Sequence, residues 1–232
     1  PHLFEQVAPG EYFLDVIGND GNYYKPRFYS DWEDIAFNNS FSHDHHIDLT
    51  GGTENAKFAF SLGHTNQEGL MIESYYRRTN AKFNADIEVN KWLGVSTVLL
   101  YSRGKSARGD DDTRTVAEAW PIIPSKYPDD PAIYGIYAGK WATGRDFPVG
   151  ENWPGIEYRY DQRDGYYLNE QVTGSISLNA QITNDLSFKT DFSIDSRSEN
   201  QRWYNGNFQG NRTSDADGRN SEWFYWQNEN YF

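Results

Sequence analysis

Histidine and aspartate clusters are the residues of this 232-residue sequence whose types could bind a metal ion. His43 and His45 would share one face of a strand, and neutral imidazoles are common ligands of transition metals. No third ligand follows at a diagnostic spacing, so an ordinary strand start is favoured. The stretch 213–218 resembles a calcium loop, but Phe224 stands where a bidentate glutamate would close it. We therefore assign no metal ligand and no cofactor.

The sequence also lacks the motifs of enzyme chemistry. It contains no Gly-x-Ser-x-Gly, phosphate-binding loop or HExxH pattern. The absence of cysteine excludes a thiol nucleophile, a thiolate zinc site and a disulfide scaffold. The carboxylates are too numerous to pair by spacing alone. We therefore expect no enzymatic activity and assign no catalytic residue.

Aromatic side chains in a long connection at 104–166 are the remaining candidates for function. Prolines alternate with them, which lowers the entropy lost when the connection becomes ordered. Two interpretations stay open: the aromatics form a small core and a seam with a partner, or they contact a ligand. The candidate contact residues are Trp120, Tyr134, Tyr137, Trp141 and Trp153. Because this aromatic content could offset the ordering entropy, we expect the connection to be largely ordered.

The elements that would position these residues are strands. Apolar and polar residues alternate with period two, most clearly over 81–90 and 172–183. About seven strands are predicted, and no long amphipathic helix. Their approximate ranges are 44–50, 56–65, 74–90, 92–103, 167–183, 185–199 and 222–232. The sequence therefore predicts an all-β fold.

Composition limits the class of protein further. There are 34 acidic and 21 basic residues, giving a net charge of −13, which disfavours nucleic acid as a partner. No apolar run is long enough for a transmembrane helix. No signal peptide is recognised at the start, so we expect a processed chain or a piece of a longer one.

The predicted connections are short and long in strict alternation. Short turns at 51–55, 90–91 and 184–185 alternate with links at about 64–73, 104–166 and 200–221. Outer-membrane barrels have this asymmetry, with short periplasmic turns and long extracellular loops, and aromatic residues near the strand ends. A soluble β-sandwich or lectin-like sheet is the alternative that the pattern leaves open.

One segment resembles a known family. It contains Asp31–Ile35, His45–Glu54, Phe60–Leu70, Tyr76–Asn80 and Trp92–Val95, in this order and register. These elements resemble the early barrel of SusC/RagA-type TonB-dependent transporters of the Bacteroidota outer membrane. That family has a DW-x-D element, a strand ending in S-G-G-S/T and a strand closing with S-x-G-Y-x-x-Q-E-G-I/L. Thr50 and His64 are mild departures from this pattern.

The resemblance implies an antiparallel transmembrane β-barrel of roughly 22 strands around a plug. This chain would supply about seven of those strands, without the plug. Residues 1–43 would be an extracellular region leading into the barrel, and 44–103 would form four strands. Residues 104–166 would be a long extracellular loop. Residues 167–232 would add further strands, with an extracellular loop at about 200–221.

As family inference, the chain would belong to an importer of glycans or peptides in the outer membrane of a Bacteroidota-like bacterium. A SusD-like lipoprotein would be its surface partner, TonB would act through the missing plug region, and outer-membrane lipid would surround the barrel. Two alternatives stay open. The barrel could be a structural subunit of a larger outer-membrane complex, or the chain could be a soluble glycan-binding β module.

Overall fold

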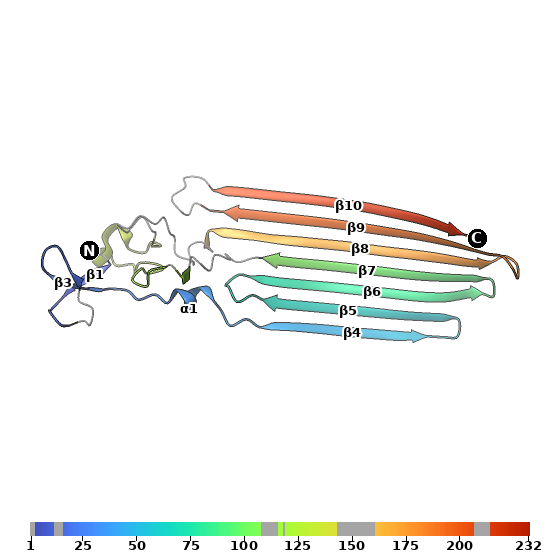
Figure 1. Ribbon diagram of the computed structural model, residues 1–232, viewed down its shortest axis with the longest axis horizontal. Coiled ribbons are helices and arrows are strands. Elements are labelled where there is room, and N and C mark those ends of the chain that lie inside the picture. Colours follow the sequence, from blue (N-terminus) through green and yellow to red (C-terminus); the bar gives the residue numbers. More distant parts are fainter. Residues whose placement is uncertain (1–2, 12–15, 108–115, 118, 143–160, 207–213) are drawn as a thin grey trace. The chain divides into compact units, whose positions relative to one another are not determined.

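The computed structural model describes residues 3–11, 16–107, 116–117, 119–142, 161–206 and 214–232 (Figure 1). The chain forms two compact units. The first contains residues 1–38, 109–164 and 204–215. The second contains residues 39–108, 165–203 and 216–232.

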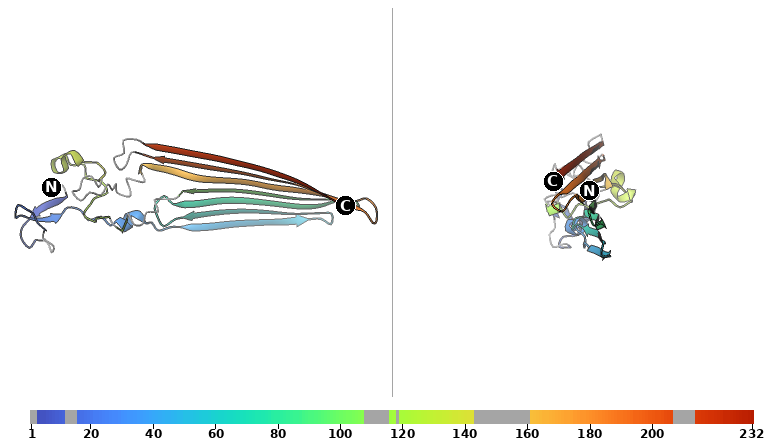
Figure 2. Two further views of the ribbon diagram at one scale, coloured as in Figure 1. Left: turned by 45° about the horizontal axis from the view of Figure 1, so that its top comes forward. Right: turned by 90° about the vertical axis from the view of Figure 1, so that its right-hand side faces the viewer.

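A seven-stranded sheet, in the order β10-β9-β8-β7-β6-β5-β4, makes up the second unit. Strands β4 to β8 pair antiparallel, and the arrows in Figure 1 keep alternating through β10. Figure 2 shows the twist of this sheet. Its strands are β4 (Ser42–Gly52), β5 (Ala56–Glu68), β6 (Tyr75–Asn90), β7 (Leu93–Ala107), β8 (Arg163–Gln181), β9 (Ser187–Asn205) and β10 (Asp215–Tyr231). The predicted all-β fold with seven antiparallel strands is confirmed.

Several strands are longer than the sequence predicted. β9 continues to Asn205 and β10 begins at Asp215, so most of the loop expected at 200–221 is strand. Strand β10 also contains most of the stretch that resembles a calcium loop. The start of β10 is polar apart from Ala216, and the end of β9 is polar up to the adjacent aromatics Trp203 and Tyr204, so neither end shows alternation. Hydrogen bonding between strand backbones does not require alternating side chains. Sequence periodicity therefore could not predict these ends of β9 and β10.

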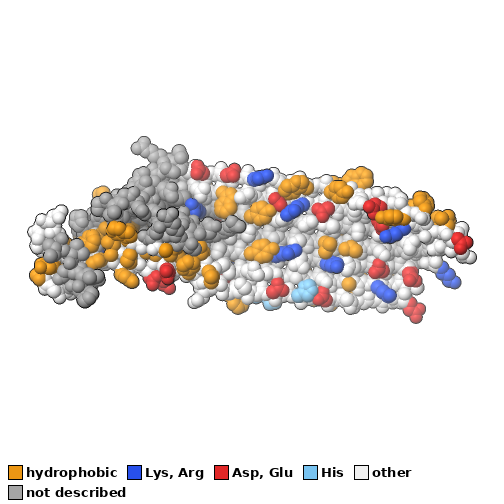
Figure 3. All heavy atoms as spheres, in the orientation of Figure 1, with side chains coloured by type: hydrophobic (Ala, Val, Ile, Leu, Met, Phe, Trp, Pro, Cys, Tyr) orange, Lys and Arg blue, Asp and Glu red, His pale blue; other side chains and the backbone are white. Residues whose placement is uncertain are grey.

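The two faces of the sheet differ in character. Because directly paired residues of an antiparallel sheet point to the same side, the register places rows of apolar residues together. One such row is Leu49, Phe60, Phe83, Leu99 and Gly174. We call the side of this row the apolar face, and the other side the polar face. Figure 3 shows charged side chains of both signs along the strands in the view that it presents.

The polar face carries rows such as Asp48, Ser61, Lys82, Leu100 and Thr173. Leu100 is an apolar exception in this row. On β9, the side chains of Asp191 and Asp195 belong to the polar face, because they hydrogen-bond Ser177 and Thr173. The alternation predicted from the sequence is thus present in three dimensions from β4 to β9.

Tight turns close one end of the sheet. The Asn90 side chain accepts hydrogen bonds from the backbone N–H groups of Trp92 and Leu93, which shapes the β6–β7 turn. A Cβ on Gly52 would lie 2.4 Å from the Ala56 carbonyl oxygen, so the β4–β5 turn requires glycine there. The connections at this end are 53–55, 91–92 and 182–186. The connections at the other end are 69–74, 108–162 and 206–214, and the predicted alternation in length is therefore present.

The first unit combines the N-terminal segment with part of the long connection. A small sheet in the order β1-β3-β2 contains β1 (Phe4–Val7), β2 (Val16–Ile17) and β3 (Tyr23–Pro26). Short helices are α1 (Trp32–Ala36), α3 (Pro131–Tyr134) and the 3-10 helix η1 (Gly135–Tyr137). Sequence periodicity had not indicated these short elements. Among the described residues, no helix has the length and apolar character needed to cross a membrane.

Candidate functional site

A hollow of about 250 Å³ lies on the polar face of β6, β7 and β8. Its lining residues come from three successive rows of the sheet. The first row contains Tyr76, Ser106 and Tyr167, and the second contains Arg78, Gly104 and Asn169. The third row contributes Ser102 and Gln171. The hollow therefore combines two phenol rings, amide and hydroxyl groups and one guanidinium.

Glycine at position 104 gives the hollow its open floor. Gly104 lies between Arg78 and Asn169 in the register, where any other residue would project a side chain into this space. A Cβ built there would lie 3.7 Å from the Tyr76 hydroxyl oxygen, which is an ordinary van der Waals distance. The backbone thus tolerates a larger residue at this position. What glycine provides is room for a group from outside the sheet.

Hydrogen bonds fix several polar side chains around the hollow. Arg78 Nε donates to Ser102 Oγ at 3.2 Å. Gln171 Nε2 donates to Asp195 Oδ2 at 3.0 Å. The Tyr167 hydroxyl hydrogen-bonds the Glu199 carboxylate. Because these contacts order the lining groups in advance, less entropy is lost when a ligand binds.

The candidate aromatic contacts that the structure describes belong to the first unit, and none of them is among the residues that line this hollow. Tyr134 and Tyr137 pack against a small core of Leu3, Tyr127 and Ala142. Their ring centroids lie 6.0 and 5.6 Å from that of Tyr127. These two tyrosines are therefore used in a small core, as one of the two interpretations expected. Their contact with a partner or ligand stays a prediction.

The tryptophan candidates have different surroundings. The Trp120 side chain is 48% exposed, and its carbonyl oxygen accepts a hydrogen bond from Trp32 Nε1 at 3.0 Å. The Lys126 ammonium lies 5.4 Å from the centroid of the Trp141 ring. Trp153 lies outside the described residues. Of the two candidate tryptophans that the structure describes, Trp120 therefore has the ring that is more exposed to a partner or ligand.

The DW-x-D element has a local structural role. Asp31 caps helix α1, because its Oδ1 accepts hydrogen bonds from the backbone N–H groups of Glu33 and Asp34. Trp32 is buried and hydrogen-bonds the carbonyl of Trp120, while Ser30 Oγ donates to the carbonyl of Ile123 at 2.7 Å. The element therefore attaches the N-terminal segment to the long connection.

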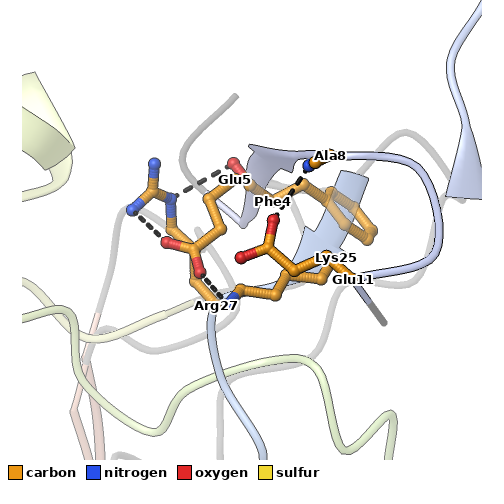
Figure 4. A network of polar contacts seen from close by, with 6 residues as sticks. All are labelled: Phe4, Glu5, Ala8, Glu11, Lys25 and Arg27. Atoms are coloured by element: carbon orange, nitrogen blue, oxygen red, sulfur yellow. Dashed lines mark hydrogen bonds and ion pairs between the residues drawn. The ribbon is translucent and has the colours of Figure 1, made fainter. Parts of the chain in front are cut away.

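Charged side chains order the small sheet of the first unit. Figure 4 shows Lys25 and Arg27 converging on the Glu5 carboxylate, at 2.9 and 3.4 Å. The hydrogen bond from Lys25, together with the positive charges, holds the pKa of Glu5 below its ordinary value. Hydrogen bonds from Tyr24 and Asn22 lower the pKa of Asp20 from 3.8 to about 2. These contacts have a structural role, because they join β1 to β3 and order the turn that precedes β3.

Histidines cluster more closely than sequence spacing suggested. The ring of His43 lies 5.0 Å from that of His45 and 6.2 Å from that of His64 on the neighbouring strand. His64 was not grouped with the other two because only strand pairing brings it near them. Within the described ranges, however, no group of three or more His, Cys, Asp or Glu residues has the arrangement to hold a metal ion.

Comparisons with known proteins find one similar sequence and several similar folds. No family model matches the sequence. A stretch of 55 residues is 38% identical to the TonB-dependent receptor SusC of Bacteroides thetaiotaomicron, and covers 24% of this chain and 6% of the receptor. The chain thus spans a small part of its curated relative.

Solved structures extend the likeness in fold to nearly the whole chain. A structure of the RagAB peptide transporter matches with a TM-score of 0.62 at 16% identity, and covers 95% of this chain and 24% of that chain. The RagAB peptide importer in its closed-closed state matches with a TM-score of 0.57, also at 16% identity, over 92% of this chain and 24% of that one. The sequence match supports the predicted resemblance to SusC/RagA-type receptors, and the solved structures show that the chain shares its fold with about a quarter (24%) of each of those chains.

Proposed function

We propose that this chain is part of a SusC-like TonB-dependent transporter in the outer membrane, which imports glycans or peptides together with a SusD-like lipoprotein. The resemblance to SusC and the fold of the RagAB peptide transporter support this assignment. Binding and gating are the chemistry required, and no bond is made or broken. The absence of catalytic motifs from the sequence agrees with this role.

The observation that carries the proposal is the uncovered apolar face. Of the hydrophobic side chains buried in the described residues, only Ala85 belongs to the seven-stranded sheet. Large apolar side chains on this face are exposed instead, among them Ile47, Leu49, Phe58 and Ile176. If this face were in water, exposing its apolar surface would cost a free energy of about 25 cal/mol for each Å². Lipid in contact with this face removes that cost, and the polar face then lines the interior.

The two ends of the sheet support an orientation. Short turns segregate to the periplasmic side of outer-membrane barrels. Connections 53–55, 91–92 and 182–186 are therefore assigned to the periplasm. The regions 1–43 and 104–166 are assigned to the outside, together with the connection inside the predicted loop at 200–221. The extracellular regions are then the place where a lipoprotein partner binds, and TonB acts through the plug region that the resemblance implies.

The test is uptake by the complete receptor in its native host. Cells with and without the gene receive fluorescent oligosaccharides and fluorescent peptides, and the receptor is recovered by affinity tag from the outer-membrane fraction. We expect one ligand class to enter only when both the receptor and TonB are present, and a lipoprotein to co-purify. The structural-subunit alternative would be favoured if uptake did not depend on the receptor and if deletion of its gene caused loss of a larger outer-membrane complex. Recovery without detergent would favour the soluble module.

A further inference from the structure

Arg78 is the one charged side chain among the described residues that line the hollow, and its lining neighbours are neutral. Its Nε–H is held by Ser102, and it forms no ion pair within the described strands. Two other arginines of the sheet form ion pairs. Arg103 pairs with Glu170 at 3.0 Å, and Arg197 pairs with Glu199 at 3.1 Å.

Carboxylates of the polar face on other strands are already engaged. Asp44 lies in the same row as Arg78 and accepts a hydrogen bond from Thr65, which stands between them. Asp195 Oδ2 accepts hydrogen bonds from Gln171 at 3.0 Å and from Thr173 Oγ1 at 2.8 Å. Glu199 accepts from Tyr167 and from Arg197. The remaining N–H donors of Arg78 therefore face a hollow in which the described residues supply no anion.

The lining of the hollow favours a ligand that carries a carboxylate together with other polar groups. A guanidinium presents a planar fork that matches the two oxygens of a carboxylate. Tyr76 and Tyr167 occupy the adjacent row on either side of Ser106, where their rings can pack on the ligand. Asn169 offers an amide for hydroxyl or peptide groups, and Gly104 leaves the space between these side chains open.

We infer that Arg78 binds a carboxylate of the transported ligand, and that the hollow over Gly104 is a subsite for an acidic oligomer. This inference rests on the proposed transport function and narrows its substrate class. The carboxylate could belong to an acidic sugar or to a peptide, and the chemistry of recognition is the same for both.

The test compares charged and neutral ligands of equal size. The complete receptor is purified in detergent, and calorimetry measures its affinity for two pairs of probes. One pair is trigalacturonic acid and its methyl ester, and the other is a glutamate-containing peptide and its glutamine analogue. We expect the acidic member of one pair to bind about tenfold tighter or more, as is typical of a charge-assisted hydrogen bond. The pair that shows this preference identifies the source of the carboxylate.

Substitutions assign the preference to the hollow. Arg78→Gln should abolish the difference between charged and neutral probes, and Arg78→Lys should retain part of the difference. Gly104→Val should fill the hollow and weaken both members of the pair. Gly94→Val is the matched control on the same strand and face, because a Cβ there meets nothing closer than 3.9 Å. It should leave both affinities unchanged.

Three results would overturn the inference. The wild-type receptor could bind acidic and neutral members of both pairs equally, or Arg78→Gln could preserve the preference. Arg78→Gln could also lower the unfolding temperature without changing the preference, which would indicate an ion pair with another segment of the receptor. If any of these results is found while uptake still depends on TonB, the inference about Arg78 is wrong and the proposed transport function is retained. Loss of that dependence in wild-type cells would instead contradict the transport function itself.

Discussion

Phe60 on β5 lies directly opposite Phe83 on β6, on the apolar face of the sheet. Leu49 and Leu99 continue this row on the two flanking strands. Because side chains alternate along a strand, a slip of one residue would move each of these groups to the polar face. The apolar pattern therefore specifies the register, and the register in turn builds the hollow on the opposite side.

A charge on the apolar face should be costly if that face contacts lipid. Ile176 is exposed there, opposite Thr97, whereas Ser177 is on the polar face, opposite Ser96. We expect Ile176→Arg to lower the free energy of unfolding by roughly 2–4 kcal/mol if the residue lies near the bilayer midplane. Denaturant unfolding of the receptor in lipid vesicles measures this change. Ser177→Arg is the control and should cost little; equal losses would indicate a sheet buried on both faces.

The proposed orientation predicts which cysteines react on intact cells. This sequence contains no cysteine, so an introduced thiol is the only one in these 232 residues, and any cysteine elsewhere in the receptor is first replaced by serine. A membrane-impermeant maleimide should label Lys140→Cys, an exposed position in the long connection, and should not label Asn184→Cys in a short turn. Permeabilised cells should label at both positions. The reverse pattern on intact cells would invert the orientation.

Sequence was sufficient to predict those parts of the fold that depend on local pattern. The alternation around Phe83 and Ile176 identified the strands and their faces. The residue type of Asn90 predicted a turn, and in the structure its side chain accepts two hydrogen bonds there. The ends of β9 and β10 were missed because pairing there depends on backbone groups alone. Local pattern thus gives the middle of each strand better than its ends.

The candidate site depended on long-range pairing and was therefore not predicted. Tyr76 and Tyr167 belong to strands separated by the long connection, and only the register through Ser106 brings them into one row. The same is true of His64 beside His43. One sequence feature did relate to the hollow, because Gly104 is a glycine inside a strand and does not form a turn. Its role becomes clear only when strand pairing places Arg78 and Asn169 on either side of it.

Tyr127 should stabilise the first unit. It is almost completely buried, and Phe28, Tyr134 and Tyr137 surround its ring. Tyr127→Ala should lower the stability of this unit by about 3–5 kcal/mol, as is typical when a buried aromatic is removed. Limited proteolysis of the receptor should then cleave residues 116–142 faster. Ile136→Ala is the control, because that side chain is 75% exposed.

The pKa of Asp20 provides a test of local structure in the small sheet. The Tyr24 hydroxyl donates a hydrogen bond of 2.6 Å to Asp20, and this bond is the largest cause of the fall from 3.8 to about 2. Because the folded pKa is depressed, the contact stabilises the fold above pH 3.8 and is lost as the pH falls through about 2. Carbon-13 NMR of labelled aspartate carboxyls should give this midpoint. Tyr24→Phe should move it upward, and an unchanged midpoint would contradict the assigned cause.

Trp120 should bind the lipoprotein partner through its exposed ring. Its carbonyl, and not its side chain, accepts the bond from Trp32, so Trp120→Ala leaves that contact with the N-terminal segment in place. Tryptophan is a favoured anchor at protein interfaces, and we expect a loss of about 2 kcal/mol or more in binding, measured by co-purification at graded salt and by calorimetry. Trp92→Ala is the matched control, because the 56% exposed Trp92 lies at the short-turn end of the strands. If both variants keep the partner, the long connection does not use Trp120 for the interface. If Trp120→Ala keeps the partner but impairs uptake, its ring contacts the ligand instead.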